Sequence, residues 1–400
     1  MDITSQSPYF IGIILVLIGF FAGFVLSDIF SSRKKKAADK STQSGGTAYL
    51  KGINYILANE PDRAIEEFSK AVQINSDTVE TYIALGNLFR SKGEVGRAIR
   101  IHQGIILRPH IDIKTKIQAY YDLSLDFKKA GFVNRAIESF EKVLEMDNKH
   151  LDSHVQLLEL YEDIRDWEKS YQTQQAISKL RKSNDYNVLA HHQTELAKTL
   201  IEQGLSSQAK KCFKKAISLD KMCSDAYLHL GDLFYDEGSY AKAIDTWKEM
   251  MQISPGFTYL AYPRLEEAFF KLNEFGKIED ILRENSRKNY NDIHTHLALA
   301  EYLYKKSQLN DAIGELKTVL TLKPSHIQAR QALGKYLMEL GREAEAVAVH
   351  QELLHNFPFP EKNYQCNECG YESNELLWRC PQCRRWDTID EKPLPGEKEK

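Results

Sequence analysis

Residues 231–255 read GDLFYDEGSYAKAIDTWKEMMQISP, one of the clearest copies of a pattern that repeats along the chain. Gly231 is followed by an aromatic residue three positions on, by Ala243 twelve positions on and by Trp247 sixteen positions on. The pattern predicts two antiparallel helices whose small residues allow a close approach, with large residues filling the space around the contact. Pro255 ends the second helix, because proline lacks the backbone N–H and clashes with the preceding turn.

The same pattern returns along most of the chain. Its anchor position, held by Gly231 in the copy above, falls at residues 52, 86, 124, 158, 197, 231, 266, 300 and 334. Most steps between these positions are 34 residues, and insertions of four and five residues precede the third and fifth copies. One helix pair cannot cover its own apolar face, so neighbouring pairs are expected to stack into a superhelix.

A 34-residue period with this pattern resembles the tetratricopeptide repeat. The resemblance covers residues 47–358 and includes three degraded copies. The fourth has Ser170 where alanine is expected, the fifth follows an insertion near residue 183, and the seventh has Glu266 and Ile278 at its small positions. The insertions are compatible either with longer helices or with added loops.

Four of the six cysteines form two C-x2-C pairs, Cys366 with Cys369 and Cys380 with Cys383. Two such knuckles at this separation predict one tetrahedral metal site, and four soft sulfurs favour zinc or a mononuclear iron centre. Two disulfides are the alternative, which is disfavoured because the rest of the chain indicates a reducing compartment. Four thiolates leave no open coordination position, which argues for a structural or docking role over catalysis.

The two knuckles resemble those of rubredoxin-like and zinc-ribbon domains. Gly370 suits the left-handed turn that points backbone N–H groups at sulfur. Arg384 stands where glycine is usual in the second knuckle, which puts the geometry of that turn in question. The expected apolar wrapping comes from Tyr371, Trp378 and Trp386.

The first 30 residues predict a membrane anchor. No charged residue occurs from Ile3 to Ser27, and the apolar run approaches the roughly 20 residues that a helix needs to span hydrocarbon. The basic cluster Arg33–Lys36 follows this run, whereas a cleavable signal peptide carries its positive charge before it. The positive-inside rule then places the rest of the chain in the cytoplasm.

The predicted fold class is all-α: a tetratricopeptide-repeat superhelix of about nine repeats with an N-terminal transmembrane helix and a small C-terminal rubredoxin-like or zinc-ribbon metal module. The predicted segments are an anchor at 1–30, a flexible basic linker at 31–46, the repeat array at 47–358, the rubredoxin-like metal-binding domain at 359–386 and a disordered tail at 387–400.

Charge and motifs indicate neither a nucleic-acid-binding protein nor an enzyme. The chain has 53 basic and 56 acidic residues, so no basic excess attracts nucleic acid. Phosphate-loop, nucleophile-elbow, H-E-x-x-H and dinucleotide signatures do not occur. We interpret the paired histidines as exposed or capping residues rather than metal ligands; these pairs are His150 with His154, His191 with His192, and His294 with His296.

Tetratricopeptide arrays bind partners in a groove lined by the first helix of each repeat, and some capture a C-terminal carboxylate with a Lys/Asn clamp. The polar residues at such groove positions are Asn87, Arg90, Lys128, Lys129, Lys198 and Lys335. They do not repeat the clamp pattern on adjacent helices. We therefore predict a protein-binding groove that does not capture a carboxylate.

The anchor, the repeats and the metal domain, in this order, resemble the lipopolysaccharide assembly protein B family of Gram-negative bacteria. The resemblance implies a non-enzymatic, single-pass inner-membrane adaptor, with its bulk in the cytoplasm, that regulates lipid A synthesis. The implied partners are a membrane-bound AAA+ metalloprotease, the committed-step deacetylase whose degradation the adaptor promotes, and other lipopolysaccharide synthesis and transport proteins. Formation of a homodimer stays open.

A second hypothesis comes from a different functional class. In it, the chain is a membrane-tethered redox or metal-sensing regulator, and one iron or zinc ion held by the four thiolates controls partner binding.

Overall fold

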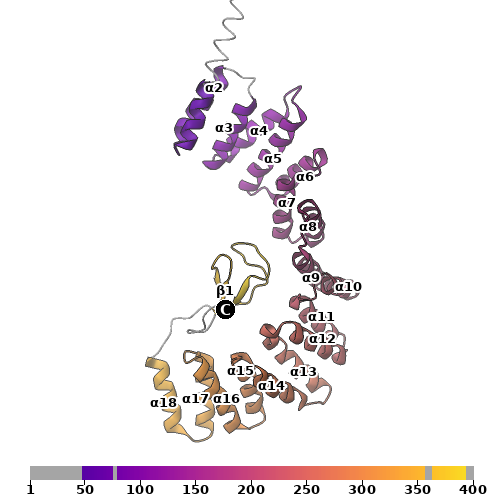
Figure 1. The fold of residues 1–400 in the computed structure, drawn as a ribbon, viewed down its shortest axis with the longest axis vertical. Coiled ribbons are helices and arrows are strands. Elements are labelled where there is room, and N and C mark those ends of the chain that lie inside the picture. The colour runs from indigo at the N-terminus through magenta and orange to yellow at the C-terminus, as the bar shows by residue number, and fades with distance from the viewer. Residues whose placement is uncertain (1–46, 75–78, 356–362, 393–400) are drawn as a thin grey trace, which may run out of the picture. The chain divides into compact units, whose positions relative to one another are not determined.

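The computed structural model describes residues 47–74, 79–355 and 363–392 (Figure 1). The predicted anchor at 1–30, the linker at 31–46 and the end of the predicted tail lie outside these residues. Within the described part of the chain, no helix is both long and apolar enough to cross a membrane.

The described helices follow one another in nine pairs, as predicted for a tetratricopeptide array. The first helices of the pairs are residues 47–57, α3 (Val79–Ser91), α5 (Ile113–Lys129), α7 (Leu151–Asp163), α9 (Tyr186–Glu202), α11 (Ser224–Asp236), α13 (Tyr262–Lys271), α15 (Ile293–Lys305) and α17 (Ile327–Glu339). The second helices are α2 (Pro61–Ile74), α4 (Val95–Ile106), α6 (Val133–Met146), α8 (Trp167–Arg181), α10 (Ser206–Leu219), α12 (Tyr240–Ile253), α14 (Lys277–Lys288), α16 (Leu309–Leu322) and α18 (Glu343–His355). The 3-10 helix η1 (Pro255–Leu260) precedes α13.

The described residues form two compact units, one up to Leu160 and one from Tyr161 onward, and each has its own core. In the first unit, Phe68 and Phe89 are buried with the small residues Ala64 and Ala98. In the second unit, one large cluster of buried residues continues from α11 to α18. Each core is therefore the continuous layer that stacking of helix pairs produces.

The glycines at the anchor positions lie against the large residue sixteen positions on. A Cβ atom added to Gly231 would lie 2.2 Å from Trp247 Nε1, and one added to Gly86 would lie 2.5 Å from His102 Nε2. The prediction paired the anchor with the alanine of the second helix, whereas these nearest contacts belong to the aromatic or imidazole side chain. The glycine is needed because a ring packs directly on its Cα.

The two insertions lengthen helices. The first helices α5 and α9, which follow the insertions, each have 17 residues, whereas α3 and α11 each have 13. The four extra residues add about one helical turn to α5 and to α9. Asp185, at the end of the second insertion, also accepts a hydrogen bond from the Ser178 hydroxyl at 2.7 Å, which fixes the turn between α8 and α9.

Candidate metal centre and its docking surface

A small antiparallel sheet holds the cysteine knuckles. Its strands are β1 (Tyr364–Cys366), β2 (Glu372–Ser373) and β3 (Ile389–Glu391), in the order β2-β1-β3. Strand β3 lies in the segment predicted as a disordered tail, so the folded module continues beyond the predicted boundary at residue 386. Residues 389–391 are ordered because they pair with β1. The prediction of a disordered tail rested on charged and proline-containing composition, which carries no information about such pairing.

The sheet and its turns bring the four cysteine sulfurs together. All four lie within 4.8 Å of one another, and the Cys366–Cys383 and Cys369–Cys380 sulfur pairs are 3.7 and 3.6 Å apart. Four sulfurs at 2.3 Å from a tetrahedrally bound zinc would be separated by about 3.8 Å. A disulfide needs about 2.05 Å, and all four cysteines are free. The cluster is thus a rubredoxin-like site with the donor set for one zinc or iron ion.

The two knuckles share one turn geometry. The Gly370 N–H donates to the Cys366 carbonyl at 2.9 Å, and the Arg384 N–H donates to the Cys380 carbonyl at 2.8 Å. Both residues are left-handed, with φ of 74° at Gly370 and 61° at Arg384. The arginine therefore adopts the backbone conformation that the prediction questioned, at a cost of about 1 kcal/mol. The Arg384 side chain forms an ion pair with α7, in which Arg384 Nη2 lies 3.0 Å from Asp163 Oδ2.

The protonation of the thiols also favours a bound cation. Burial raises the pKa of Cys366, but hydrogen bonds with Thr388 and with the backbone of the knuckle outweigh it, so the pKa falls to about 6. A backbone hydrogen bond at Tyr371 lowers the pKa of Cys369, but burial and the neighbouring sulfurs raise it to about 12. One thiolate thus suppresses ionisation of its neighbours. A metal ion removes this repulsion and allows all four to bind as thiolates.

Only one of the three expected wrapping residues packs in the core of the module. Tyr371 packs against the buried Cys366, Cys380 and Ile389. Trp386 instead stacks on His191 of α9, with ring centroids 4.8 Å apart. Trp378, whose ring centroid is 5.2 Å from that of Phe257, contacts η1. The two tryptophans therefore attach the module to the repeats of the second unit.

Polar contacts complete this docking surface. Arg379 pairs with Glu162 of α7, whose other carboxylate oxygen lies 2.7 Å from His192 Nε2. Asp387 Oδ1 lies 2.7 Å from His191 Nε2. Farther along the unit, Tyr364 contacts the hydroxyl of Tyr259 at 3.1 Å. His294 Nε2 of α15 lies 2.6 Å from Glu391 Oε1. The module therefore contacts α7, α9, η1 and α15.

Replacing Arg379 by methionine is expected to weaken docking by about 3 kcal/mol, because the Glu162 carboxylate is 6% exposed and loses its cationic partner. Native-state hydrogen exchange of β1 and β3 in the metal-loaded protein measures this loss. Arg385→Met is the matched control, since Arg385 pairs with Glu368 within the module and is 61% exposed, so it should change docking by less than about 1 kcal/mol. Equal effects of the two variants would contradict the conclusion that the Arg379–Glu162 pair stabilises docking of the module.

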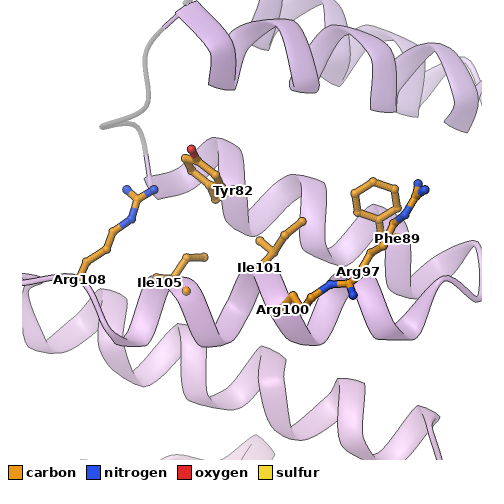
Figure 2. Close-up of a pocket in the computed structure, with 8 residues that line it drawn as sticks. Tyr82, Phe89, Arg97, Arg100, Ile101, Ile105 and Arg108 are labelled. Carbon is orange, nitrogen blue, oxygen red and sulfur yellow. The ribbon is translucent and has the colours of Figure 1, made fainter.

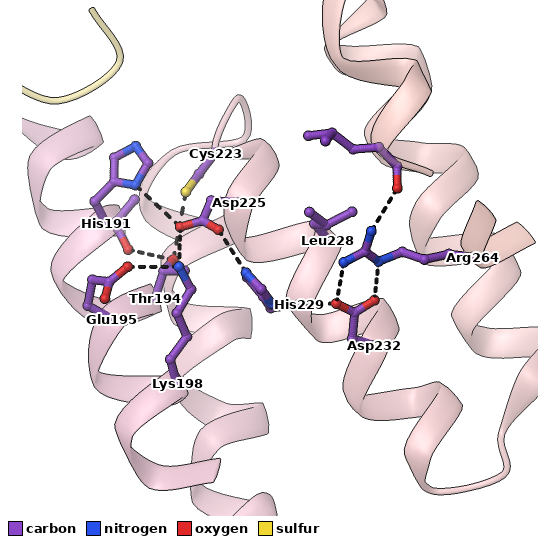
Figure 3. A network of polar contacts seen from close by, with 12 residues as sticks. His191, Thr194, Glu195, Lys198, Cys223, Asp225, Leu228, His229, Asp232 and Arg264 are labelled. Atoms are coloured by element: carbon purple, nitrogen blue, oxygen red, sulfur yellow. Dashed lines mark hydrogen bonds and ion pairs between the residues drawn. The ribbon is translucent and has the colours of Figure 1, made fainter. Parts of the chain in front are cut away.

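Asp387 of the docked module contacts His191, and His191 borders a buried network of charges (Figure 3). Asp225 is fully buried, and its carboxylate contacts Lys198 Nζ at 2.9 Å and His229 Nε2 at 3.2 Å. Burial raises the pKa of Asp225, but hydrogen bonding to His229 and the charge of Lys198 lower it to about 2. His191 Nδ1 lies 3.9 Å from the same carboxylate, while its other nitrogen contacts Asp387. Asp225 is thus an ionised group directly beneath the docking surface.

Four of the five basic side chains predicted to line the groove contact a neighbouring repeat. Arg90 donates to Asp122 and Asp126 of α5, at 3.1 and 2.9 Å. Lys128 pairs with Glu159 of α7, and Lys198 pairs with Asp225 of α11. The ammonium of Lys335 lies 4.6 Å from the Tyr304 ring centroid. Asn87 lies on α3 and Lys129 lies at the end of α5. The groove cations therefore connect successive repeats.

Several histidines interpreted as exposed or capping are contact residues. His191 is 1% exposed and His192 is fully buried, each with a carboxylate partner. His294 and His191 both stand six residues before the anchor of their repeat, at positions 300 and 197. This shared register is a sequence signal that places the two on the same side of the array. His150 and His154 make local contacts, to Ser153 and to the Asn148 carbonyl.

The first unit has a basic pocket of about 390 Å³ between α3 and α4 (Figure 2). The guanidinium of Arg108 covers the Tyr82 ring at 4.4 Å, and that of Arg97 covers the Phe89 ring at 5.3 Å. Arg97 also pairs with Glu94 at 2.9 Å. These stacked arginines cover apolar rings at the surface of the second repeat.

Comparisons with known families match both parts of this architecture. The family described as "Rubredoxin metal binding domain" matches residues 364–391, and the family described as "Tetratricopeptide repeat" matches residues 194–256 and 297–359. The metal family covers all three strands and all four cysteines of the candidate centre.

Curated relatives align along almost the whole chain. Lipopolysaccharide assembly protein B of Haemophilus influenzae is 28% identical over 373 residues, which cover 91% of this chain and 93% of that protein. The protein of the same name from Escherichia coli K12 is 27% identical over 350 residues, which cover 87% and 89%. Among solved structures, MamA covers 42% of this chain and 94% of its own, with 19% identity and a TM-score of 0.32.

Proposed function

We propose that this chain, whose resemblance to the lipopolysaccharide assembly protein B family is confirmed along 91% of its length, is a non-enzymatic adaptor in lipopolysaccharide assembly. The observation that carries the proposal is the docking of a closed four-thiolate module on the first helices of the repeats. A tetrathiolate ion has no open position for a substrate, whereas a module fixed in the groove adds to a protein-binding surface.

The bound metal would supply folding energy. Zinc-finger peptides of similar size gain on the order of 10–16 kcal/mol from the metal at neutral pH. Cys366, Cys369, Cys380 and Cys383 would hold the ion, while Arg379, Trp378 and Trp386 transmit the fold of the module to the repeats. The metal thus acts through the shape of the surface that partners contact.

The proposed location is the bacterial inner membrane, with a single-pass anchor at residues 1–30 and the bulk of the chain on the cytoplasmic side. The proposed partners are a membrane-bound AAA+ metalloprotease and the deacetylase of the committed step of lipid A synthesis, together with other lipopolysaccharide proteins. Confining the adaptor to the membrane plane raises the effective concentration of one bound partner near the other. The adaptor thereby promotes degradation of the deacetylase.

Depletion of the chain is expected to lengthen the half-life of the deacetylase without changing its rate of synthesis. Pulse-chase labelling of the deacetylase in depleted and complemented cells measures both quantities. Complementation with a form that lacks residues 1–30 is the control for colocation, and it should restore degradation only weakly. An unchanged half-life after depletion would overturn the adaptor function.

A redox or metal-sensing role remains the second candidate, because the donor set accepts iron as well as zinc. An iron-loaded form would be red, would bleach reversibly on reduction and would change its affinity for partners. If cells that contain only the zinc-loaded protein degrade the deacetylase at the normal rate, the redox or metal-sensing role is wrong.

A further inference from the structure

The seventh repeat leaves a pocket on the groove side of the second unit. Its first helix α13 has 10 residues where α15 has 13, and η1 precedes it. Glu266 and Ile278 stand at two positions where the repeat pattern has small residues. Side chains of α13, α14 and α15 line the space between these helices. The space between them is a cavity of about 560 Å³, within the usual size of ligand pockets.

The floor of this cavity is apolar and its rim carries an exposed aromatic ring. Ile278 and Leu282 of α14, each 2% exposed, form the floor, and Leu297 of α15 lines one side. Phe270 lines the opening and is 62% exposed. Its ring meets that of Phe275, itself 52% exposed, edge to face at 5.3 Å. An exposed aromatic pair beside an apolar cavity is a usual feature of a protein-binding hot spot.

The polar lining of the cavity has an excess of negative charge. Lys305 Nζ lies 2.9 Å from Glu266 Oε1 and 3.2 Å from Glu301 Oε1, so two carboxylates share one ammonium. Glu267 accepts a hydrogen bond from the neutral Tyr235 hydroxyl at 2.7 Å, and within residues 47–74, 79–355 and 363–392 it forms no ion pair. The local field therefore attracts a cation and repels a carboxylate.

The docked metal module lies at one end of the same cavity. Tyr259 and His294 line the cavity, and they contact Tyr364 and Glu391 of the module. The pocket is thus continuous with the docking surface on which the adaptor proposal rests.

We propose that this pocket, named here the Phe270 pocket, binds a short segment of a partner protein in which a bulky apolar residue is followed by basic residues. The apolar side chain enters between α13 and α15 and packs on Phe270. The basic residues pair with Glu267 and Glu301 at the rim. The inference rests on the proposed adaptor function and supplies the chemistry by which one partner is recognised.

Three fluorescein-labelled peptides test this chemistry with the purified, metal-loaded full chain in neutral detergent. The first has the sequence Gly-Ser-Gly-Leu-Phe-Arg-Lys-Gly-Ser-Gly, the second has Glu-Glu in place of Arg-Lys, and the third has Ser-Ser in place of Leu-Phe. Fluorescence anisotropy is expected to show at least about tenfold tighter binding of the first peptide than of the others, with binding that weakens as salt rises.

Matched variants locate the binding to the pocket. Phe270→Ser and Glu301→Lys are each expected to weaken binding of the first peptide by about tenfold. The controls are Phe132→Ser, at an exposed phenylalanine of the other unit, and Glu284→Lys, at a glutamate of α14 that is 64% exposed; neither should change the affinity. Circular dichroism checks that all four variants keep their helices.

Absence of binding by the first peptide, equal binding of the Glu-Glu peptide, or full affinity of the Phe270→Ser and Glu301→Lys variants would each overturn the inference. The assay uses purified protein, so its result does not depend on the half-life of the deacetylase. An unchanged half-life with intact peptide selectivity overturns the adaptor function alone. A lengthened half-life with lost peptide selectivity overturns the Phe270 pocket alone.

Discussion

The Cys366→Ser, Cys369→Ser double variant is expected to lose the metal, unfold the C-terminal module and abolish adaptor activity, while the repeat helices stay folded. Removing two of four thiolates destroys the tetrahedral donor set, and a module with three short strands has little apolar core of its own. The repeats keep their own continuous core in each unit, so their helical signal should persist.

The consequences should extend to the repeats that carry the module. When the module unfolds, Glu162 loses its ion pair with Arg379. His191 loses both its contact with Asp387 and the stacked ring of Trp386. Hydrogen exchange in α7 and α9 should therefore rise, while exchange in α16 and α17, which the described contacts of the module do not reach, should stay the same.

Three measurements decide the outcome: the metal content of the purified protein, its far-ultraviolet circular dichroism, and the half-life of the deacetylase in cells. Cys212→Ser is the control, because Cys212 lies on α10 away from the cluster and should change none of the three. Wild-type degradation by the double variant would show that the module is dispensable. Loss of most helical signal would show that it holds the array together.

The Gly231→Ala variant is expected to destabilise the second unit by about 2 kcal/mol, although alanine is the better helix former by about 1 kcal/mol. The added methyl group would lie 2.2 Å from Trp247 Nε1, and that ring is 1% exposed. The indole cannot move away freely, because its N–H donates to the Leu228 carbonyl at 3.0 Å.

The eighth repeat supplies the compensating change. It has Ala300 at the anchor and Leu316 sixteen positions on, and both are buried. Trp247→Leu alone should cost about 3 kcal/mol through the cavity and the lost hydrogen bond. In the double variant the methyl group of alanine enters the space that the indole left, so the combined cost should be about 2 kcal/mol less than the sum.

Denaturant unfolding of the four proteins in this cycle, together with hydrogen exchange in α11 and α12, measures the coupling between the two positions. Gly96→Ala is the control, since an added Cβ there meets no heavy atom within 4 Å, and it should not destabilise. Strict additivity of Gly231→Ala and Trp247→Leu would contradict the proposed contact.

Local spacing in the chain was sufficient to predict the repeat pairs and the cysteine cluster. Helix pairs of 34 residues and C-x2-C knuckles are both local patterns, in which the backbone itself brings the partners together. The turn at Arg384 was harder to judge, because its left-handed backbone is allowed at a modest cost that composition does not show.

The partners of the charged groove residues could not be predicted from the sequence. The sequence placed Arg90, Lys128 and Lys198 correctly on first helices but gave no sign that carboxylates of the next repeat accompany them. That pairing depends on how far one repeat is rotated against the next, which is set by packing of many side chains. Small changes of that rotation move a side chain by several ångströms, beyond the reach of a hydrogen bond.

The helical pairs and the four thiolate donors were predictable because each follows from residues close together in the chain, and the order of these segments carries the family resemblance. The docking site of the metal module and the position of the Phe270 pocket depend instead on packing between residues far apart in the chain. The Arg379–Glu162 pair joins residues 217 positions apart, and the His191–Asp387 pair joins residues 196 positions apart. Such contacts follow from the stacking of several repeats, and no local pattern in the chain encodes them.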